Sequence, residues 1–328
     1  MRYLRLLTSC AAASATLLSG AVFSQGTVDA YPSKPVMVIV PYATGGPVDR
    51  EGRLYSAKLS KLMGQQFVVD SKPGAGTTIG TAYVARAKPD GYTLLVVAAS
   101  FTTFPAVYKE LPFDTMKDFA PVSLVSKRAI VLVAHPGFPA KTFPEYVAYA
   151  KANPGKINFG TSGAGGVSHL GGAWLHSATN TKVTFVHYKG TGALLPDLIA
   201  GRLDVTPAAF LVSLSMIKSG KLRVLALMNK ERSDLLPGVP TIAEQGIPGY
   251  DYASWTGFIA PAATPAAIVN KLSEALAKVA KAPDVVAALE ADGGMPVGST
   301  PAQFRQFLVA ETDRWRKVAR DGGIKLEQ

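Results

Sequence analysis

The sequence is nearly free of cysteine. Cys10 is the single cysteine among 328 residues, and it lies in an N-terminal stretch that we interpret as a cleaved leader. The mature chain is therefore expected to contain none. That absence excludes disulfide bonds and thiol catalysis, so the fold has to be stabilised by a hydrophobic core.

One N-terminal segment lacks charge. Arg2 and Arg5 precede an uncharged apolar run from Leu6 to Phe23, and small residues follow. This order is typical of a secretory signal peptide, so we interpret residues 1–24 as one and expect a periplasmic protein. An N-terminal membrane anchor is the alternative. Serines and a glycine interrupt the run, however, and no later segment approaches the roughly 18 apolar residues of a membrane helix.

Long runs of basic residues are also missing. The formal net charge is +11 at pH 7 and becomes +9 when Arg2 and Arg5 are removed, yet no run of Lys and Arg exceeds two residues. Scattered basic residues favour solubility and a mild bias toward anionic ligands. We therefore expect a small anion as the partner and no nucleic acid.

Motifs for catalysis, cofactors and metals are absent as well. Gly160–Ala164 misses the nucleophile elbow GxSxG at its last position, and neither GxxxxGK[ST] nor HExxH occurs. The four histidines, His135, His169, His176 and His187, form no dense cluster with acidic residues. The sequence thus predicts no cofactor, no metal site and no enzymatic activity; a hydrolase acting on a carboxylated substrate remains the alternative.

What is present is a regular alternation of strand and helix. Hydrophobic residues make up 48% and charged residues 17% of the chain, which is a globular composition. One series of strands and helices covers residues 36–98, and a similar series covers residues 129–227. A helical region follows at 265–321, which we expect to pack on the first series. The pattern predicts an α/β protein with two lobes, each a mostly parallel sheet flanked by helices.

Three glycine-rich turns open helices in this pattern: Tyr42–Pro47, Gly74–Thr78 and Thr161–Ser168. Backbone N–H groups at a helix start have no partner within the helix, and together with the helix dipole they favour an anion. Small residues let a ligand approach the backbone closely. Any one turn is equally well explained by ordinary capping. The three together predict anion binding.

The chain resembles the substrate-binding proteins of tripartite tricarboxylate transporters, also called the Bug family. The resemblance rests on short strings that occur in order over nearly the whole mature chain. They are Tyr31–Val36, Ile39–Gly46 with Asp49, Gly74–Gly76, Lys88–Leu95, Asp118–Val122, His187–Gly190, Pro196–Gly201, Leu236–Thr241 and Trp255–Phe258.

This resemblance implies a periplasmic type II binding fold, with a ligand cleft between two lobes that close on the ligand. It implies a first lobe made of residues 25–127 and 254–328, and a second lobe made of residues 128–253. It also implies a monomer that delivers its ligand to an inner-membrane tripartite transporter or to a sensor.

The resemblance further implies that a ligand carboxylate is held between turns of the two lobes. The first-lobe residues expected to bind it are Tyr42, Ala43, Thr44, Gly45, Asp49, Thr77 and Ser100. The second-lobe residues are Thr161, Ser162, Ser168, His169, Tyr188 and Asp204.

Some positions depart from the usual pattern of the family. Ala173-Trp174 stands where a small residue followed by Glu is frequent. Such changes leave open what holds the far end of the ligand. An aliphatic or aromatic mono- or dicarboxylate is expected, and an amino-acid or amide ligand is the alternative, with Asp204 accepting a ligand amine.

Overall fold

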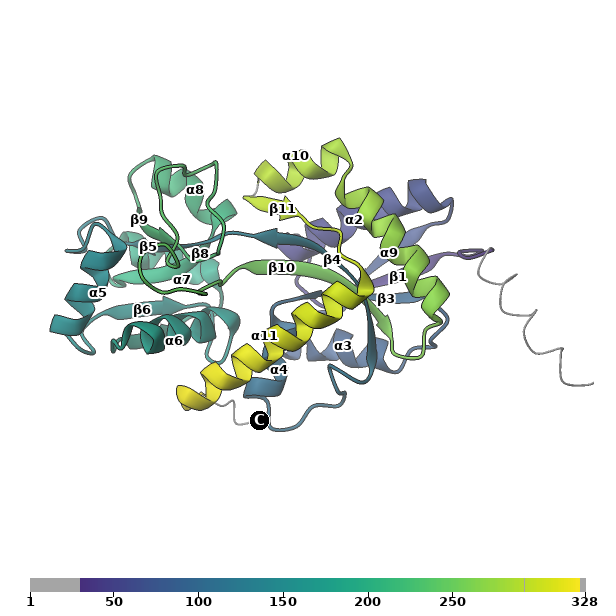
Figure 1. The fold of residues 1–328 in the computed structure, drawn as a ribbon, viewed down its shortest axis with the longest axis horizontal. Helices are drawn as coiled ribbons and strands as arrows, with labels where there is room; N and C mark the ends of the chain where they lie inside the picture. The colour runs from purple at the N-terminus through teal and green to yellow at the C-terminus, as the bar shows by residue number, and fades with distance from the viewer. Residues whose placement is uncertain (1–29, 292, 325–328) are drawn as a thin grey trace, which may run out of the picture.

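The computed structural model describes residues 30–291 and 293–324, so the predicted signal peptide lies outside the described residues. Two β-sheets, each flanked by helices, lie side by side and form two lobes (Figure 1). The first sheet takes its strands from residues 36–128 and 254–296, and the second from residues 130–227.

The first sheet has six strands in the order β11-β4-β10-β3-β1-β2. β1 pairs in parallel with β2 and β3, whereas β10 pairs antiparallel with both β3 and β4. All but one of the five side chains of β1 are buried, as expected for a strand covered on both faces. The strands are β1 (Val36–Val40), β2 (Phe67–Ser71), β3 (Thr93–Ala98), β4 (Phe119–Arg128), β10 (Ser254–Pro261) and β11 (Gly294–Pro296).

Helices from both ends of the chain cover the first sheet. The apolar stripe of α9 is buried against the strands through Leu272 and Leu276, among others, as the sequence pattern predicts. The helices of this lobe are α2 (Pro47–Met63), the short η1 (Ala75–Thr77), α3 (Thr78–Ala85), α4 (Ser100–Val107), α9 (Ala266–Ala280) and α10 (Pro283–Ala291).

The second sheet has five strands in the order β7-β6-β8-β5-β9. β6 pairs in parallel with β7 and β8, and β5 pairs antiparallel with β8 and β9. The strands are β5 (Ile130–Ala134), β6 (Asn158–Thr161), β7 (Thr184–His187), β8 (Val205–Ala209) and β9 (Arg223–Leu227). The helices are α5 (Phe143–Ala152), α6 (Val167–Thr179), α7 (Thr191–Ile199) and α8 (Phe210–Lys218).

The two-lobed α/β fold is confirmed, but the sheets are mixed and not mostly parallel. The parallel part is confined to β1, β2 and β3 in one lobe and to β6, β7 and β8 in the other. The sequence pattern did not predict β4 and β10, the strands through which the chain leaves and re-enters the first lobe. Because they pair antiparallel with each other, they change the character of the sheet.

The last helix, α11 (Pro301–Asp321), runs from one lobe to the other (Figure 1). Near its start, Phe304 and Leu308 pack in the core of the first lobe. Near its end, Trp315 and Val318 pack in the core of the second lobe. The expectation that the C-terminal helices pack on the first lobe is therefore right for α9 and wrong for the second half of α11.

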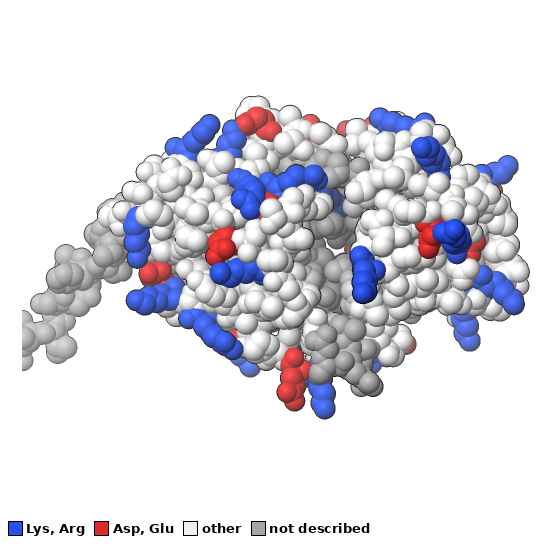
Figure 2. All heavy atoms as spheres, turned by 180° about the vertical axis from the view of Figure 1, so that it is seen from behind, with Lys and Arg blue, Asp and Glu red and all other residues white. Residues whose placement is uncertain are grey.

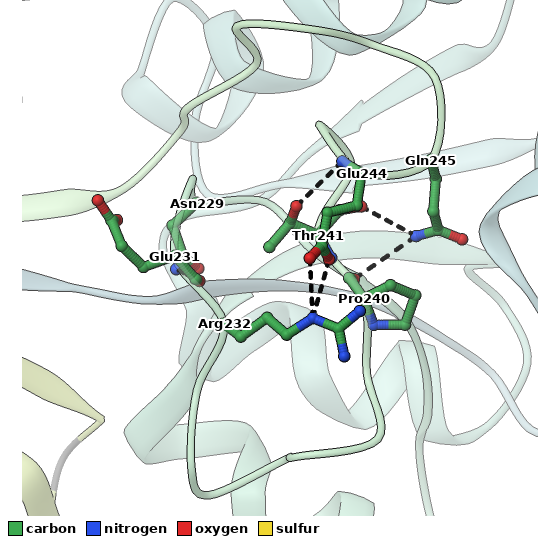
Figure 3. Close-up of polar contacts among 7 residues, drawn as sticks. All are labelled: Asn229, Glu231, Arg232, Pro240, Thr241, Glu244 and Gln245. Atoms are coloured by element: carbon green, nitrogen blue, oxygen red, sulfur yellow. Dashed lines mark hydrogen bonds and ion pairs between the residues drawn. The ribbon is translucent and has the colours of Figure 1, made fainter.

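Polar contacts order the long segment between β9 and β10, which contains no strand. Nε of Arg232 donates to the carboxylate of Glu244 over 2.9 Å, and that carboxylate also accepts the backbone N–H of Thr241 at 2.8 Å (Figure 3). An isolated bridge joins Thr241 to Leu227 at the end of β9. The segment is thereby held against the edge of the second sheet.

Basic side chains are spread over both lobes. On the face shown in Figure 2, Lys and Arg are scattered and interspersed with Asp and Glu, with no continuous basic patch. Among residues 30–291 and 293–324, no helix is long and apolar enough to cross a membrane.

His176 of α6 is buried in the core of the second lobe and is fully hydrogen-bonded there. Its Nε2 lies 3.1 Å from Oη of Tyr146, and its Nδ1 lies 2.8 Å from Oγ1 of Thr181. Burial lowers the pKa of His176 from 6.5 to about 3. The ring is therefore neutral in the folded protein at all but strongly acid pH.

This burial makes stability depend on pH in a defined window. As the pH falls below 6.5, His176 becomes protonated in the unfolded chain, whereas in the folded protein it stays neutral until about pH 3. The free energy of unfolding is expected to fall across that window. Thermal unfolding from pH 4 to 7 should show a shallower slope in His176→Gln than in the wild type; identical slopes would contradict the assignment.

Candidate functional site

Three of the predicted first-lobe residues meet at the carboxyl ends of β1 and β3. Oη of Tyr42 lies 2.8 Å from Oγ of Ser100 and accepts the backbone N–H of Ala98 at 3.1 Å. Oγ1 of Thr77 lies 3.4 Å from the same Ser100 hydroxyl. Burial raises the pKa of Tyr42 to about 12, so the phenol stays protonated. The three hydroxyls form one connected group of neutral donors.

Asp49 holds the adjoining Tyr42–Gly46 turn through hydrogen bonds. Its Oδ2 accepts the backbone N–H of Gly45 at 3.0 Å and Nε of Arg53 at 2.9 Å, and its Oδ1 accepts the Ser71 hydroxyl at 3.1 Å. The hydrogen bond from Arg53 lowers the pKa of the Asp49 carboxyl. Asp49 is buried and already has three partners. It therefore shapes the turn, whereas Ala43, Thr44 and Gly45 are its exposed residues.

The turn leads directly into α2. Gly46 is the N-cap residue and provides no side-chain cap, and Pro47 is the first helical residue. α6 in the second lobe starts in the same way, with Gly166 as an N-cap that has no side chain to offer. Each helix thus begins with backbone N–H groups that its own cap does not satisfy. Both starts suit an anionic group.

The second-lobe turn is organised by a pair of serines. Oγ of Ser168 accepts the backbone N–H of Ser162 at 2.8 Å and lies 2.8 Å from the Ser162 hydroxyl. Gly163 and Gly165 have φ of +154° and +66°, so glycine is needed at both for the chain to double back toward the helix. The predicted residues Ser162 and Ser168 are therefore brought together.

Two histidines lie beside this turn. Nδ1 of His169 accepts the backbone N–H of Gly165 at 3.0 Å, which leaves the proton of the neutral ring on Nε2. The ring centroid of His187 is 4.6 Å away, and Nδ1 of His187 is 2.7 Å from Oγ1 of the buried Thr161. Burial, with His187 as a lesser cause, lowers the pKa of His169 to about 4. His169 is a neutral N–H donor at pH 7.

His187 is a residue that the sequence reading did not place in the site. His187 ends β7, the strand that pairs in parallel with β6. The carboxyl ends of neighbouring parallel strands meet at one sheet edge, so His187 comes next to Thr161 at the end of β6. A parallel pairing of these two strands would have predicted the contact.

The remaining predicted residues, Tyr188 and Asp204, have other partners. Oη of Tyr188 donates to Asp197 at 2.6 Å, and Asp197 also pairs with Arg202 at 2.7 Å. The carboxylate of Asp204 accepts the backbone N–H of Asn158 at 2.7 Å, where it ties β6 to the segment before β8. Each side chain therefore has a role inside the second lobe. Their part in ligand binding stays a prediction.

Trp174, the position that departs from the family pattern, is engaged with α11. Its ring stacks on Tyr250 with centroids 4.3 Å apart, and the Arg314 guanidinium lies 4.9 Å from its centroid. Trp174 thus belongs to the contact between α6 and the end of α11.

The second-lobe turn lies close to the first lobe. Val167, the first residue of α6, packs against the core of each lobe and in the first lobe meets the cluster that contains Phe101 and Phe104 of α4. α4 itself begins at Ser100. In the described part of the chain, no group of three or more His, Cys, Asp and Glu residues could hold a metal ion.

The chain forms two α/β lobes that are joined through β4 and β10, and in each lobe a helix at the sheet edge begins with a glycine N-cap. This arrangement is that of a two-lobed solute-binding protein. The family described as tripartite tricarboxylate transporter family receptor matches residues 52–324 of the chain. The chain belongs to this family, and it is a periplasmic solute-binding protein and not an enzyme.

Named relatives agree with this assignment. A protein of Agrobacterium vitis, called the UPF0065 protein in the TAR-I ttuE-ttuC' intergenic region, is 40% identical over 90% of this chain and 86% of its own. Protein BugT of Bordetella pertussis is 33% identical over 92% of this chain and 93% of its own. The resemblance to Bug proteins is therefore confirmed.

Solved structures share the fold. A protein of R. palustris solved with adipate superposes with a TM-score of 0.79 at 33% identity, covering 90% of this chain and 100% of that one. MatC from Rhodopseudomonas palustris, solved with bound malate, superposes with a TM-score of 0.74 at 32% identity, covering 88% of this chain and 99% of that one.

Proposed function

We propose that this protein captures a small carboxylate, with a dicarboxylate as the first choice, between the Tyr42–Gly46 turn and the Thr161–His169 turn. It releases this ligand to a tripartite transporter in the inner membrane or to a sensor. The supporting observation is that two helices, α2 and α6, have a glycine as the N-cap residue and therefore no side-chain cap. Both helix starts lie beside clusters of neutral hydroxyl and N–H donors.

The chemistry of these donors favours an anion that is bound reversibly. Tyr42, Ser100 and Ser168 are uncharged at pH 7, and His169 is kept neutral by its lowered pKa. Hydrogen bonds from neutral groups to a carboxylate are weaker than a bidentate Arg–carboxylate pair. A ligand held in this way stabilises the closed form and still dissociates readily, as delivery to a partner requires.

The two structural neighbours solved with adipate and malate support starting with dicarboxylates of that size. Isothermal titration calorimetry of the chain from residue 25 onward, with malate, adipate and acetate, tests the proposal. At least one dicarboxylate is expected to bind with a Kd in the micromolar range. If none of these or related carboxylates binds below about millimolar, the proposal is wrong.

Ser168→Ala is expected to weaken binding of that dicarboxylate about tenfold, or about 1.4 kcal/mol. The hydroxyl accepts the Ser162 N–H and shares a hydrogen bond with its hydroxyl, so its loss loosens the turn and removes a donor. Ser219→Ala is the matched control, because that exposed hydroxyl only caps the end of α8. Equal Kd values for both variants would contradict a role of Ser168 in binding.

A further inference from the structure

A buried ion pair lies where the two interlobe strands leave the first lobe. Arg128 is the last residue of β4, and its Nη1 donates to Oε2 of Glu51 in α2 over 2.5 Å. The hydroxyl of Thr256 in β10 donates to the same Oε2 at 2.6 Å. Glu51 is 3% exposed and Arg128 is 8% exposed. One carboxylate oxygen therefore holds both strands that connect the lobes.

Stability alone explains this pair poorly. Oε1 of Glu51 and Nε of Arg128 are buried without a hydrogen-bond partner, so the desolvation of both charges is only partly compensated. Buried ion pairs can often be replaced by well-packed hydrophobic residues of similar volume without loss of stability. An ion pair whose desolvation is only partly compensated points to a role in positioning β4 and β10.

The helix that carries Glu51, α2, also carries Asp49, which supports the Tyr42–Gly46 turn. Asp49, two residues earlier, points away from Glu51 around the helix and binds the Gly45 N–H. Tyr55, one turn after Glu51, donates its hydroxyl to the carbonyl oxygen of Val125 in β4 at 3.0 Å. The first three turns of α2 are thus attached to the Tyr42–Gly46 turn on one side and to β4 on the other.

Close packing makes this part of α2 rigid. Gly52 lies so near β1 and β3 that a Cβ would come within 3.1 Å of Val40 and 3.3 Å of Val96. The chain leaves this unit at Ala129, whose N–H still donates to the Gly293 carbonyl of the first lobe, since Ile130 already belongs to β5 of the second lobe. The first possible bending point on this strand is therefore Ala129.

We propose that Glu51 is a positioning residue for ligand-driven closure. It fixes β4 and β10 at the ends where they leave the first lobe, so that bending of the β4 connection is confined to the residues beyond Arg128, and it connects that hinge through α2 to the Tyr42–Gly46 turn. The inference rests on the proposed function, because closure on a ligand is what the hinge serves.

The test uses Glu51→Gln and the double variant Glu51→Gln/Arg128→Gln. The chain from residue 25 onward contains no cysteine, so Lys61→Cys in α2 and Lys151→Cys in α5 give one exposed label site on each lobe. Electron–electron double resonance between spin labels at these two sites measures the interlobe distance distribution without ligand. Thermal unfolding and calorimetry with the bound dicarboxylate complete the set.

The single variant leaves Arg128 buried without an anion, and its Tm is expected to fall by about 10 °C. The double variant removes both charges and is expected to regain most of that loss. It should nevertheless keep a broadened interlobe distance distribution and a Kd about tenfold weaker than the wild type. Asp284→Asn, which breaks the ion pair of α2 with α10 at Lys58, is the control and should change neither quantity.

The inference is overturned if the double variant regains stability together with the wild-type distance distribution and Kd. In that case the pair contributes to folding alone. Failure of the proposed function looks different, because the wild type itself would then bind no carboxylate. The distance distributions without ligand still decide whether Glu51 restricts the hinge.

Discussion

Asp49→Ala is expected to weaken carboxylate binding at least a hundredfold and to lower the free energy of unfolding by about 3 kcal/mol. The carboxylate accepts hydrogen bonds from the Gly45 N–H, from Arg53 and from the Ser71 hydroxyl, and it is buried. Its removal leaves the Gly45 N–H without its partner and frees the turn that leads into α2. The loss of turn geometry, more than a lost ligand contact, reduces affinity.

Calorimetry for the Kd and urea unfolding for the free energy are the measurements. Asp70→Ala is the control on the same lobe, since Asp70 pairs only with the half-buried Lys72 and should change stability by less than about 1 kcal/mol. Wild-type affinity in Asp49→Ala would refute the supporting role.

The Asp49 contribution also has a pH window. The pKa of this carboxyl is lowered in the folded protein, chiefly by the hydrogen bond from Arg53. Its stabilisation is therefore complete above the ordinary value of 3.8 and is lost as the pH falls through the lowered one. The wild type should lose more stability than Asp49→Ala below pH 4.

Trp315→Ala is expected to lower the free energy of unfolding by about 3–5 kcal/mol. Trp315 is 1% exposed and packs edge-on against Tyr252 and Trp174, with ring centroids about 6 Å away. The substitution creates a cavity where the end of α11 meets the second lobe. It thereby weakens a contact that joins the lobes independently of β4 and β10.

Urea unfolding measures this loss, and Val309→Ala on the same helix is the control. Val309 is 44% exposed, so its truncation should cost less than about 0.5 kcal/mol. If the two variants unfold at the same urea concentration, the end of α11 contributes little to holding the second lobe.

Much of the fold could be predicted because local patterns are strong where strands are buried and helices amphipathic. Val36–Val40 is a strand with mostly buried side chains, and the helix Ala266–Ala280 buries one apolar stripe. Phe119–Arg128 was missed, since Pro121 interrupts a sequence with no clear alternation and the strand is recognised only by its partners β10 and β11. Strand order and direction depend on such distant pairings.

The site could be predicted in part for a related reason. Glycine-rich helix starts are a local property, and the turns at Tyr42–Gly46 and Thr161–Ser168 were read from it. That Thr77 and Ser100 meet Tyr42 depends on β1 lying between β2 and β3. That Tyr188 turns to Asp197 depends on where α7 places Asp197, the third residue from its end. Neither contact is visible from spacing along the chain.

By itself the sequence determined that this protein consists of two α/β series and that α2 and α6 open at glycines suited to an anion. Those are properties of composition and of neighbouring residues. The tertiary structure decided that Asp49 supports the turn, that His187 joins Thr161, and that Glu51 holds both crossing strands. Each of these brings together residues from different elements, and only the packing of the whole chain places them within hydrogen-bonding distance.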